Sequence, residues 1–220
     1  MTTFPGSPKV LKGAIVGIDI FNPLASVAIF QYNPDRISRS VEPQYSQAGG
    51  GQTESLRLQG PPKETISASI TIDLIDQMER GESGPLGGGV SGYLAALEML
   101  VYPKTALVAA NQILLATGTM EVVPAVAPLT LFIYGWKRVV PVKMGTLSIS
   151  ETAHDSALNP IRAEVGLSMT VLTYNDLAFT HPGYWAFMAH QVVKEALATV
   201  ASVDNLGDVL GEGSDAALPA

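Results

Sequence analysis

The chain has no cysteine among its 220 residues, which excludes disulfide bonds, thiolate metal ligands and a cysteine nucleophile. Charged residues are also scarce, at 15% of the sequence against about 25% in an average soluble domain. Hydrophobic residues, by contrast, reach 47%. This balance predicts a protein whose apolar surface is covered by partner subunits.

Basic clusters and long hydrophobic runs are missing as well. Lysine and arginine number 13 against 20 acidic residues, and they are not clustered, so we expect no nucleic-acid partner. The longest apolar runs, 105–110 and 113–116, fall short of the roughly 20 residues that a membrane-spanning helix needs. Residues 1–8 lack the basic and apolar regions of a signal peptide. We therefore expect a soluble, cytoplasmic protein without a membrane span.

Motifs for catalysis or cofactor binding are not found in the sequence. The glycine-rich stretch 48–54 lacks the Gly-Lys-Ser/Thr ending of a phosphate-binding loop, and no Gly-x-Ser-x-Gly elbow occurs. His154, His181 and His190 are not paired with each other or with a carboxylate at zinc-site spacing. We expect no metal, no cofactor and no enzymatic activity.

The segment around Asn33-Pro34 organises the amino-terminal part of the chain. Apolar residues in 27–32 favour a strand, and the Asn-Pro-Asp sequence at 33–35 then ends it with a turn. Proline fixes its own φ and holds the preceding residue extended. The turn is expected to deliver Asp35, Arg36 and Arg39 to a defined place on the surface, where they would dock a partner.

Two further segments complete a first β region. Residues 10–20 are β-branched and are expected to pair with 27–32 as an antiparallel hairpin, while Gly13 and Gly17 predict a bulge or a close backbone approach. Residues 64–74 alternate strictly between apolar and polar side chains, which predicts a strand with one packed and one wet face. Asp73 and Asp76 at its end are interpreted as solvated residues rather than a catalytic pair.

A second β region spans the middle of the chain. Strands are predicted at 129–136, 139–151 and 161–174, and the sequence at 155–160 supplies a turn between the last two. With the first region, this makes about six or seven strands, enough to close a β-barrel or to form a pair of packed sheets. The predicted fold class is mainly β (α+β).

Two helices are predicted beside the strands. Val90, Leu94, Leu97 and Val101 recur at helical spacing, with Ser91 able to cap the helix and Pro103 ending it. A second helix is expected over 179–203, with proline in its first turn. The stretch 104–128 has no clear period and is interpreted as a mixed linker.

The predicted domain organisation is a β domain over 1–178, followed by the carboxy-terminal helix and a flexible acidic tail at 204–220. Glycine-rich loops are expected at 46–60 and 81–90. The carboxy-terminal helix either contacts a partner or packs on its own β domain, and its sequence suits both.

Five stretches in a fixed order resemble a known protein family. They cover residues 30–39, 58–66, 94–103, 128–136 and 159–167. In this order they are similar to the tube and baseplate-adaptor proteins of contractile injection systems, the phage-tail-like particles, and in particular to the tube-initiator type. The resemblance implies a tail-tube-like fold of packed antiparallel sheets or a barrel with one flanking helix.

The resemblance also implies a role. The chain would form a hexameric ring between the spike hub and the inner tube and would start tube assembly, within a particle that is released or acts at the cell envelope. Its partners would be other copies, the inner tube protein, the spike or hub protein, and other baseplate or sheath subunits. Many relatives continue into a LysM module that is not seen here, so cell-wall binding is not implied. The candidate interface residues are Asp35, Arg36, Arg39, Trp136, Arg162 and Trp185.

Two alternatives stay open at this stage. The chain could be the inner tail-tube subunit itself, which would polymerise into long tubes rather than stop at one ring. It could also be a small-ligand-binding or enzymatic β-barrel, which would fold as a monomer and bind a metabolite.

Overall fold

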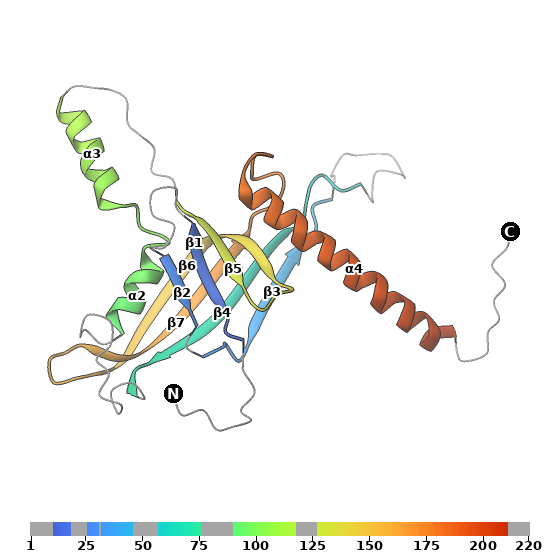
Figure 1. The fold of residues 1–220 in the computed structure, drawn as a ribbon, viewed down its shortest axis with the longest axis horizontal. Helices are drawn as coiled ribbons and strands as arrows, with labels where there is room; N and C mark the ends of the chain where they lie inside the picture. The colour runs from blue at the N-terminus through green and yellow to red at the C-terminus, as the bar shows by residue number, and fades with distance from the viewer. Residues whose placement is uncertain are drawn as a thin grey trace.

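The structure is a computed structural model that describes residues 11–18, 26–30, 32–45, 57–75, 90–117 and 127–210. One antiparallel sheet of seven strands lies at its centre, with three helices beside it (Figure 1). The strand order is β2-β1-β5-β6-β7-β4-β3. The elements are β1 (Ala14–Ile18), β2 (Ser26–Ile29), β3 (Ile37–Glu42), β4 (Lys63–Asp73), α2 (Ser91–Glu98), α3 (Thr105–Ala116), β5 (Leu129–Ile133), β6 (Val139–His154), β7 (Pro160–Val171) and α4 (Pro182–Leu210).

The core lies on one face of the sheet, as the alternating sequences predict. Ile66 of β4 pairs with Met169 of β7, and Ile70 pairs with Val165, so the apolar positions of both strands share one face. That face, together with the buried side of α2, forms the hydrophobic core. The mainly β fold class is therefore confirmed.

The first hairpin is also confirmed. β1 and β2 pair antiparallel, with Ala14 opposite Ile29. A β-carbon at Gly13 would lie 2.7 Å from the Phe30 ring, so glycine is needed there because another side chain approaches the backbone closely. The turn that joins these two strands lies outside the described residues.

The predicted closed barrel, or pair of packed sheets, is not what the described strands form. They make a single open sheet, with β2 at one edge and β3 at the other. β2 is only four residues long, and β3 pairs with the first half of β4, from Glu42 opposite Lys63 to Ile37 opposite Ala68. The short edge strands do not pair with each other within the part of the chain described, so the sheet stays open.

Two elements were not expected from the sequence. β3 occupies residues that were assigned to a docking surface, and its side chains are mostly exposed because only Ile37 and Val41 are apolar. α3 lies within 104–128, which was interpreted as a linker because its apolar residues follow no single stripe. β3 is an exposed polar segment whose register is set by its pairing with β4, so no local sequence pattern predicts this strand.

The other two helices match their predicted places but not their predicted ends. α2 begins where expected, yet Val90 takes the N-cap position and no side chain caps the helix, so the assignment of Ser91 as a cap was wrong. α4 begins at Pro182 and runs to Leu210, past the expected end at 203 into the segment predicted as a tail. The rest of that tail, and most of the two glycine-rich loops, lie outside the described residues.

Candidate assembly surface

The predicted corner after β2 is present and is held by side-chain hydrogen bonds. The Asn33 Oδ1 accepts a hydrogen bond from the Gly13 amide at 2.8 Å, and its Nδ2 donates to the Leu11 carbonyl at 2.8 Å. The Phe30 amide donates to the Gly13 carbonyl at 2.8 Å. Pro34 is buried at this corner. The Asn-Pro pair thus fixes the chain against the start of β1 in a way that proline alone would not.

Two of the predicted interface residues meet just beyond this corner. Asp35 and Arg162 line one hollow of about 360 Å³, together with Asp73 at the end of β4. The Arg162 Nε lies 3.9 Å from the Asp73 Oδ2, which makes a long, partly exposed ion pair. This hollow carries charges of both signs on a surface that is otherwise poor in charge.

Arg36 lies beside a second, wider hollow of about 590 Å³ on the face of the sheet away from the core. Most of its other lining residues are small and hydroxylated, contributed by β3, β4, β6 and β7. None of the described lining residues is a histidine or a carboxylate, so no base stands ready to activate a hydroxyl group.

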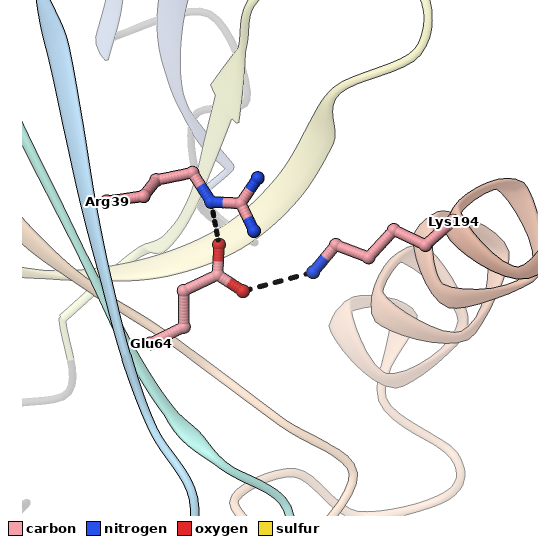
Figure 2. Close-up of polar contacts among 3 residues, drawn as sticks. All are labelled: Arg39, Glu64 and Lys194. Atoms are coloured by element: carbon pink, nitrogen blue, oxygen red, sulfur yellow. Dashed lines mark hydrogen bonds and ion pairs between the residues drawn. The ribbon is translucent and has the colours of Figure 1, made fainter. Parts of the chain in front are cut away.

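Arg39, which was predicted as an interface residue, makes an ion pair within its own chain. Figure 2 shows Glu64 of β4 between Arg39 of β3 and Lys194 of α4. The Arg39 Nε lies 2.8 Å from one Glu64 oxygen and the Lys194 Nζ lies 3.0 Å from the other, while the Glu64 side chain is only 8% exposed. A buried carboxylate is stable only with such partners, so this triad joins the edge of the sheet to α4.

His190 lies one turn before Lys194 and is buried against the same junction. Its Nδ1 has no hydrogen-bond partner, while a backbone hydrogen bond with Lys137 holds the ring. Burial lowers the pKa of His190 below its ordinary value, and the nearby Lys194 lowers that pKa further, against the opposing effect of Glu64. Burial therefore favours the neutral form of the ring where α4 meets the turn between β5 and β6.

The two tryptophans predicted as interface residues lie at the surface. Trp136 is 76% exposed in the turn between β5 and β6, and the Lys137 Nζ stands 5.1 Å from its ring centroid. Trp185 is half exposed on α4, with the Phe179 ring 4.9 Å away in an edge-to-face arrangement. Large exposed aromatic side chains of this kind are typical anchors of protein interfaces.

Leu158 is a surface residue that the sequence analysis did not single out. It lies at the tip of the β6–β7 hairpin, is strongly exposed and has a φ of 64°. Asp155 holds this turn by accepting hydrogen bonds from the amides of Ala157 at 2.7 Å and Asn159 at 2.8 Å. The turn chemistry could be predicted, but nothing local in the sequence indicates which turn residue is presented to solvent.

Within the residues that the structure describes, no group of three or more histidine and acidic side chains is placed to hold a metal ion. Among the described helices, none combines the length and the apolar character that crossing a bilayer requires.

No protein-family model and no curated protein matches the chain. Several chains in solved structures show a likeness, and two of them come from gene transfer agent particles. A chain from the tail of an empty gene transfer agent (GTA) particle, refined helically with C6 symmetry, is 15% identical over 62% of this chain and 74% of that chain, at a TM-score of 0.25. A chain from the virion of a native gene transfer agent particle is 13% identical over 72% of this chain and 90% of that chain, at a TM-score of 0.28. TM-scores this far below 0.5 do not establish a shared fold.

Proposed function

We propose that the chain is a non-catalytic, ring-forming subunit of a phage-tail-like contractile injection particle. In this role it lies between the spike hub and the inner tube and starts tube assembly, in a particle assembled in the cytoplasm. The observation that carries the proposal is the open sheet of the described strands, whose two edge strands β2 and β3 differ, on a chain with many exposed apolar side chains. The five family-like stretches support it from the sequence.

An open sheet with unlike edges favours a head-to-tail contact between copies. Unpaired strand edges are templates for association with another chain. Because β2 and β3 differ in sequence and position, a contact that joins one edge region to the other is heterologous, and repeated heterologous contacts close into a ring or continue as a filament. A ring subunit and a tube subunit both meet this description.

Exposed bulky side chains give such contacts their binding energy. Trp136, Trp185, Phe179 and Leu158 are all well exposed, and they project from turns and from α4 rather than from the core face. Interfaces derive most of their affinity from a few large residues of this kind.

The inner tail-tube subunit remains the second candidate, because a tube also needs heterologous contacts between copies. Size-exclusion chromatography and negative-stain electron microscopy of the purified protein separate the two. A single ring that nucleates tubes only when tube protein is added supports the adaptor. Long tubes formed by the protein alone would assign it to the tube, and a stable monomer that binds a metabolite would favour a ligand-binding β domain instead.

A further inference from the structure

The helix α3 is apolar and uncharged, yet it contributes nothing to the core. Its sequence has no acidic or basic residue, and none of its residues is buried. Figure 1 shows it (green) extending away from the sheet beyond α2. Ile113 is 65% exposed. Leaving such side chains in water forgoes about 25 cal/mol for each Å² of apolar surface, so a partner that covers the helix is favoured.

One side of α3 is already partly covered by its own chain. Leu107, Asn111 and Leu114 recur at helical spacing and are half-buried. The opposite side carries Ala109 and Ile113, which are exposed. Because alanine is small, a second surface can approach this side of the helix closely.

A matching apolar surface lies on the outer face of β2, β1 and β5, which we call the outer apolar face. The residues that alternate with the core positions of these strands point away from the core, and all are apolar. They are Ala14, Val16, Ile18, Val27, Ile29, Leu131 and Ile133. Leu129 alternates in the same way but is left out, because α4 already approaches it: a β-carbon on Gly183 would lie 2.9 Å from the Leu129 Cδ1. The register places Val16 between Val27 and Leu131, so the apolar side chains run across all three strands.

The outer apolar face is distinctive within the sheet. On β4 and β7 the corresponding outward positions include Ser67, Ser69 and Ser168, as expected for a face in contact with water. On β2 the outward Ile29 is 58% exposed instead. Strands that are apolar on both sides are normally covered on both sides.

The helix and the face match in size and in charge. A helix of 12 residues is about 18 Å long and about 10 Å wide. The three strands are spaced by about 4.8 Å, and five residues of strand extend about 16 Å, so one helix covers the face. No charged residue lies on either surface, so no charge would be buried without a partner.

We infer that α3 of one copy packs on the outer apolar face of the next copy. A second copy is the occupant because the two complementary surfaces belong to the same chain, while α3 extends away from the body that carries the face. The contact is heterologous, so repeated from copy to copy it closes into a ring or continues as a filament. This inference rests on the proposed function, because it identifies the contact through which the proposed ring would form.

Single-cysteine variants test the contact directly, because the natural chain has no cysteine. Ile113→Cys and Ile29→Cys proteins are mixed in equal amounts and oxidised. The expected product is a mixed 113–29 disulfide dimer on a non-reducing gel, identified by mass spectrometry of the linked peptides. Ala109→Cys repeats the test one helical turn earlier. Val200→Cys is the matched control, since Val200 is 62% exposed on α4, and it should form at least about tenfold less mixed dimer with Ile29→Cys.

Three outcomes would overturn the inference. A 113–113 disulfide as the main product would indicate a two-fold contact between helices. An intrachain disulfide in the Ile113→Cys, Ile29→Cys double variant would show that α3 covers the face of its own copy. The third outcome is a low yield: if neither Ile113→Cys nor Ala109→Cys forms more mixed dimer with Ile29→Cys than the Val200→Cys control does, α3 does not pack on the outer apolar face.

The same proteins separate this inference from the proposed function. If rings form in electron micrographs but no 113–29 link does, the α3 contact fails while the ring stands. If the 113–29 link forms but the protein neither makes rings nor nucleates tubes with tube and hub proteins, the adaptor role fails while the contact stands.

Discussion

At the scale of single residues, the buried carboxylate of Glu64 limits which substitutions its ion-pair partners accept without loss of stability. Arg39→Glu would place a second carboxylate beside this buried one, with Lys194 as the remaining cation. Because both cations are about one-third exposed, we expect a loss of about 2 kcal/mol in the free energy of unfolding, below the range for fully buried pairs. Urea denaturation of the isolated subunit measures it.

Arg36→Glu is the matched control for that substitution. It makes the same charge change three positions earlier, at an exposed residue outside the Glu64 triad, so its effect on unfolding should stay within about 0.5 kcal/mol. The expected place of Arg39 on a docking surface would by itself predict that Arg39→Glu harms assembly more than folding. The triad changes that expectation, and equal unfolding curves for the two variants would favour the earlier view.

His190 makes the stability of the α4 junction depend on pH. Its pKa is lowered in the folded protein, so below the ordinary value of 6.5 the unfolded chain binds a proton that the folded chain does not. The contribution of His190 is thus fully present above pH 6.5 and is lost as pH falls toward the folded pKa, by up to about 1.4 kcal/mol per pH unit.

Replacing His190 by glutamine removes this dependence. The His190→Gln side chain can keep a hydrogen bond to the Lys137 backbone and does not titrate. Lowering the pH from about 7.5 to 5.5 should lower the Tm of the natural protein more than that of the variant. In the variant, one fewer group gains a proton on unfolding. Thermal unfolding at several pH values measures the difference. Parallel Tm curves for the two proteins would show that His190 does not contribute.

At the scale of elements, the start of β1 depends on a glycine. Gly13→Ala would bring a methyl group to 2.7 Å from the Phe30 ring and to 3.0 Å from the Tyr134 ring. Crowding of this kind in a packed core costs about 1 to 3 kcal/mol. Chemical denaturation should show that loss for Gly13→Ala.

The double variant Gly13→Ala, Phe30→Leu tests the physical reason. Leucine lacks the ring atoms that the new methyl group meets, so the second substitution should cost less in the Gly13→Ala background than alone. A coupling energy near zero between the two sites would mean that contact with the Phe30 ring is not the reason why Gly13→Ala destabilises the protein.

Elements with a strict local pattern could be predicted, and those set by their neighbours could not. β4 and β7 alternate so regularly that their core faces are evident from the sequence. β3 has no such pattern, because its place depends on hydrogen bonds to β4 and its side chains mostly face water. The apolar residues of α3 follow no single stripe, so no amphipathic pattern marks the helix.

The same distinction holds for the candidate site. The corner at Asn33-Pro34 follows from turn chemistry. The exposure of Trp136 does not follow from the sequence, because the predicted strand 129–136 included it, whereas β5 ends at Ile133. The inward ion pair of Arg39 depends on Lys194, which is distant in sequence and is brought near by the packing of α4. Contacts between residues so far apart leave no local signal that a single sequence could show.

At the scale of the whole molecule, an excess of exposed apolar residues on a weakly charged chain predicts that association, rather than folding, is sensitive to surface truncation. Trp136→Ala removes a side chain that is 76% exposed, so the Tm of the dissociated subunit should change little. Self-association should weaken by about tenfold or more, because tryptophan is a frequent hot-spot residue. Sedimentation velocity over a concentration series measures both the association constant and the size of the oligomer.

Lys137→Ala provides the control within the same turn. It removes the cation that stands 5.1 Å from the Trp136 ring but keeps the indole and the turn backbone. If the indole itself anchors the neighbouring subunit, Lys137→Ala should leave the association constant within about threefold, since an exposed cation–π contact is worth only about 0.5 to 1 kcal/mol. If both variants weaken association equally, the conformation of the turn matters rather than the tryptophan, and Trp136 is not an anchor of the assembly.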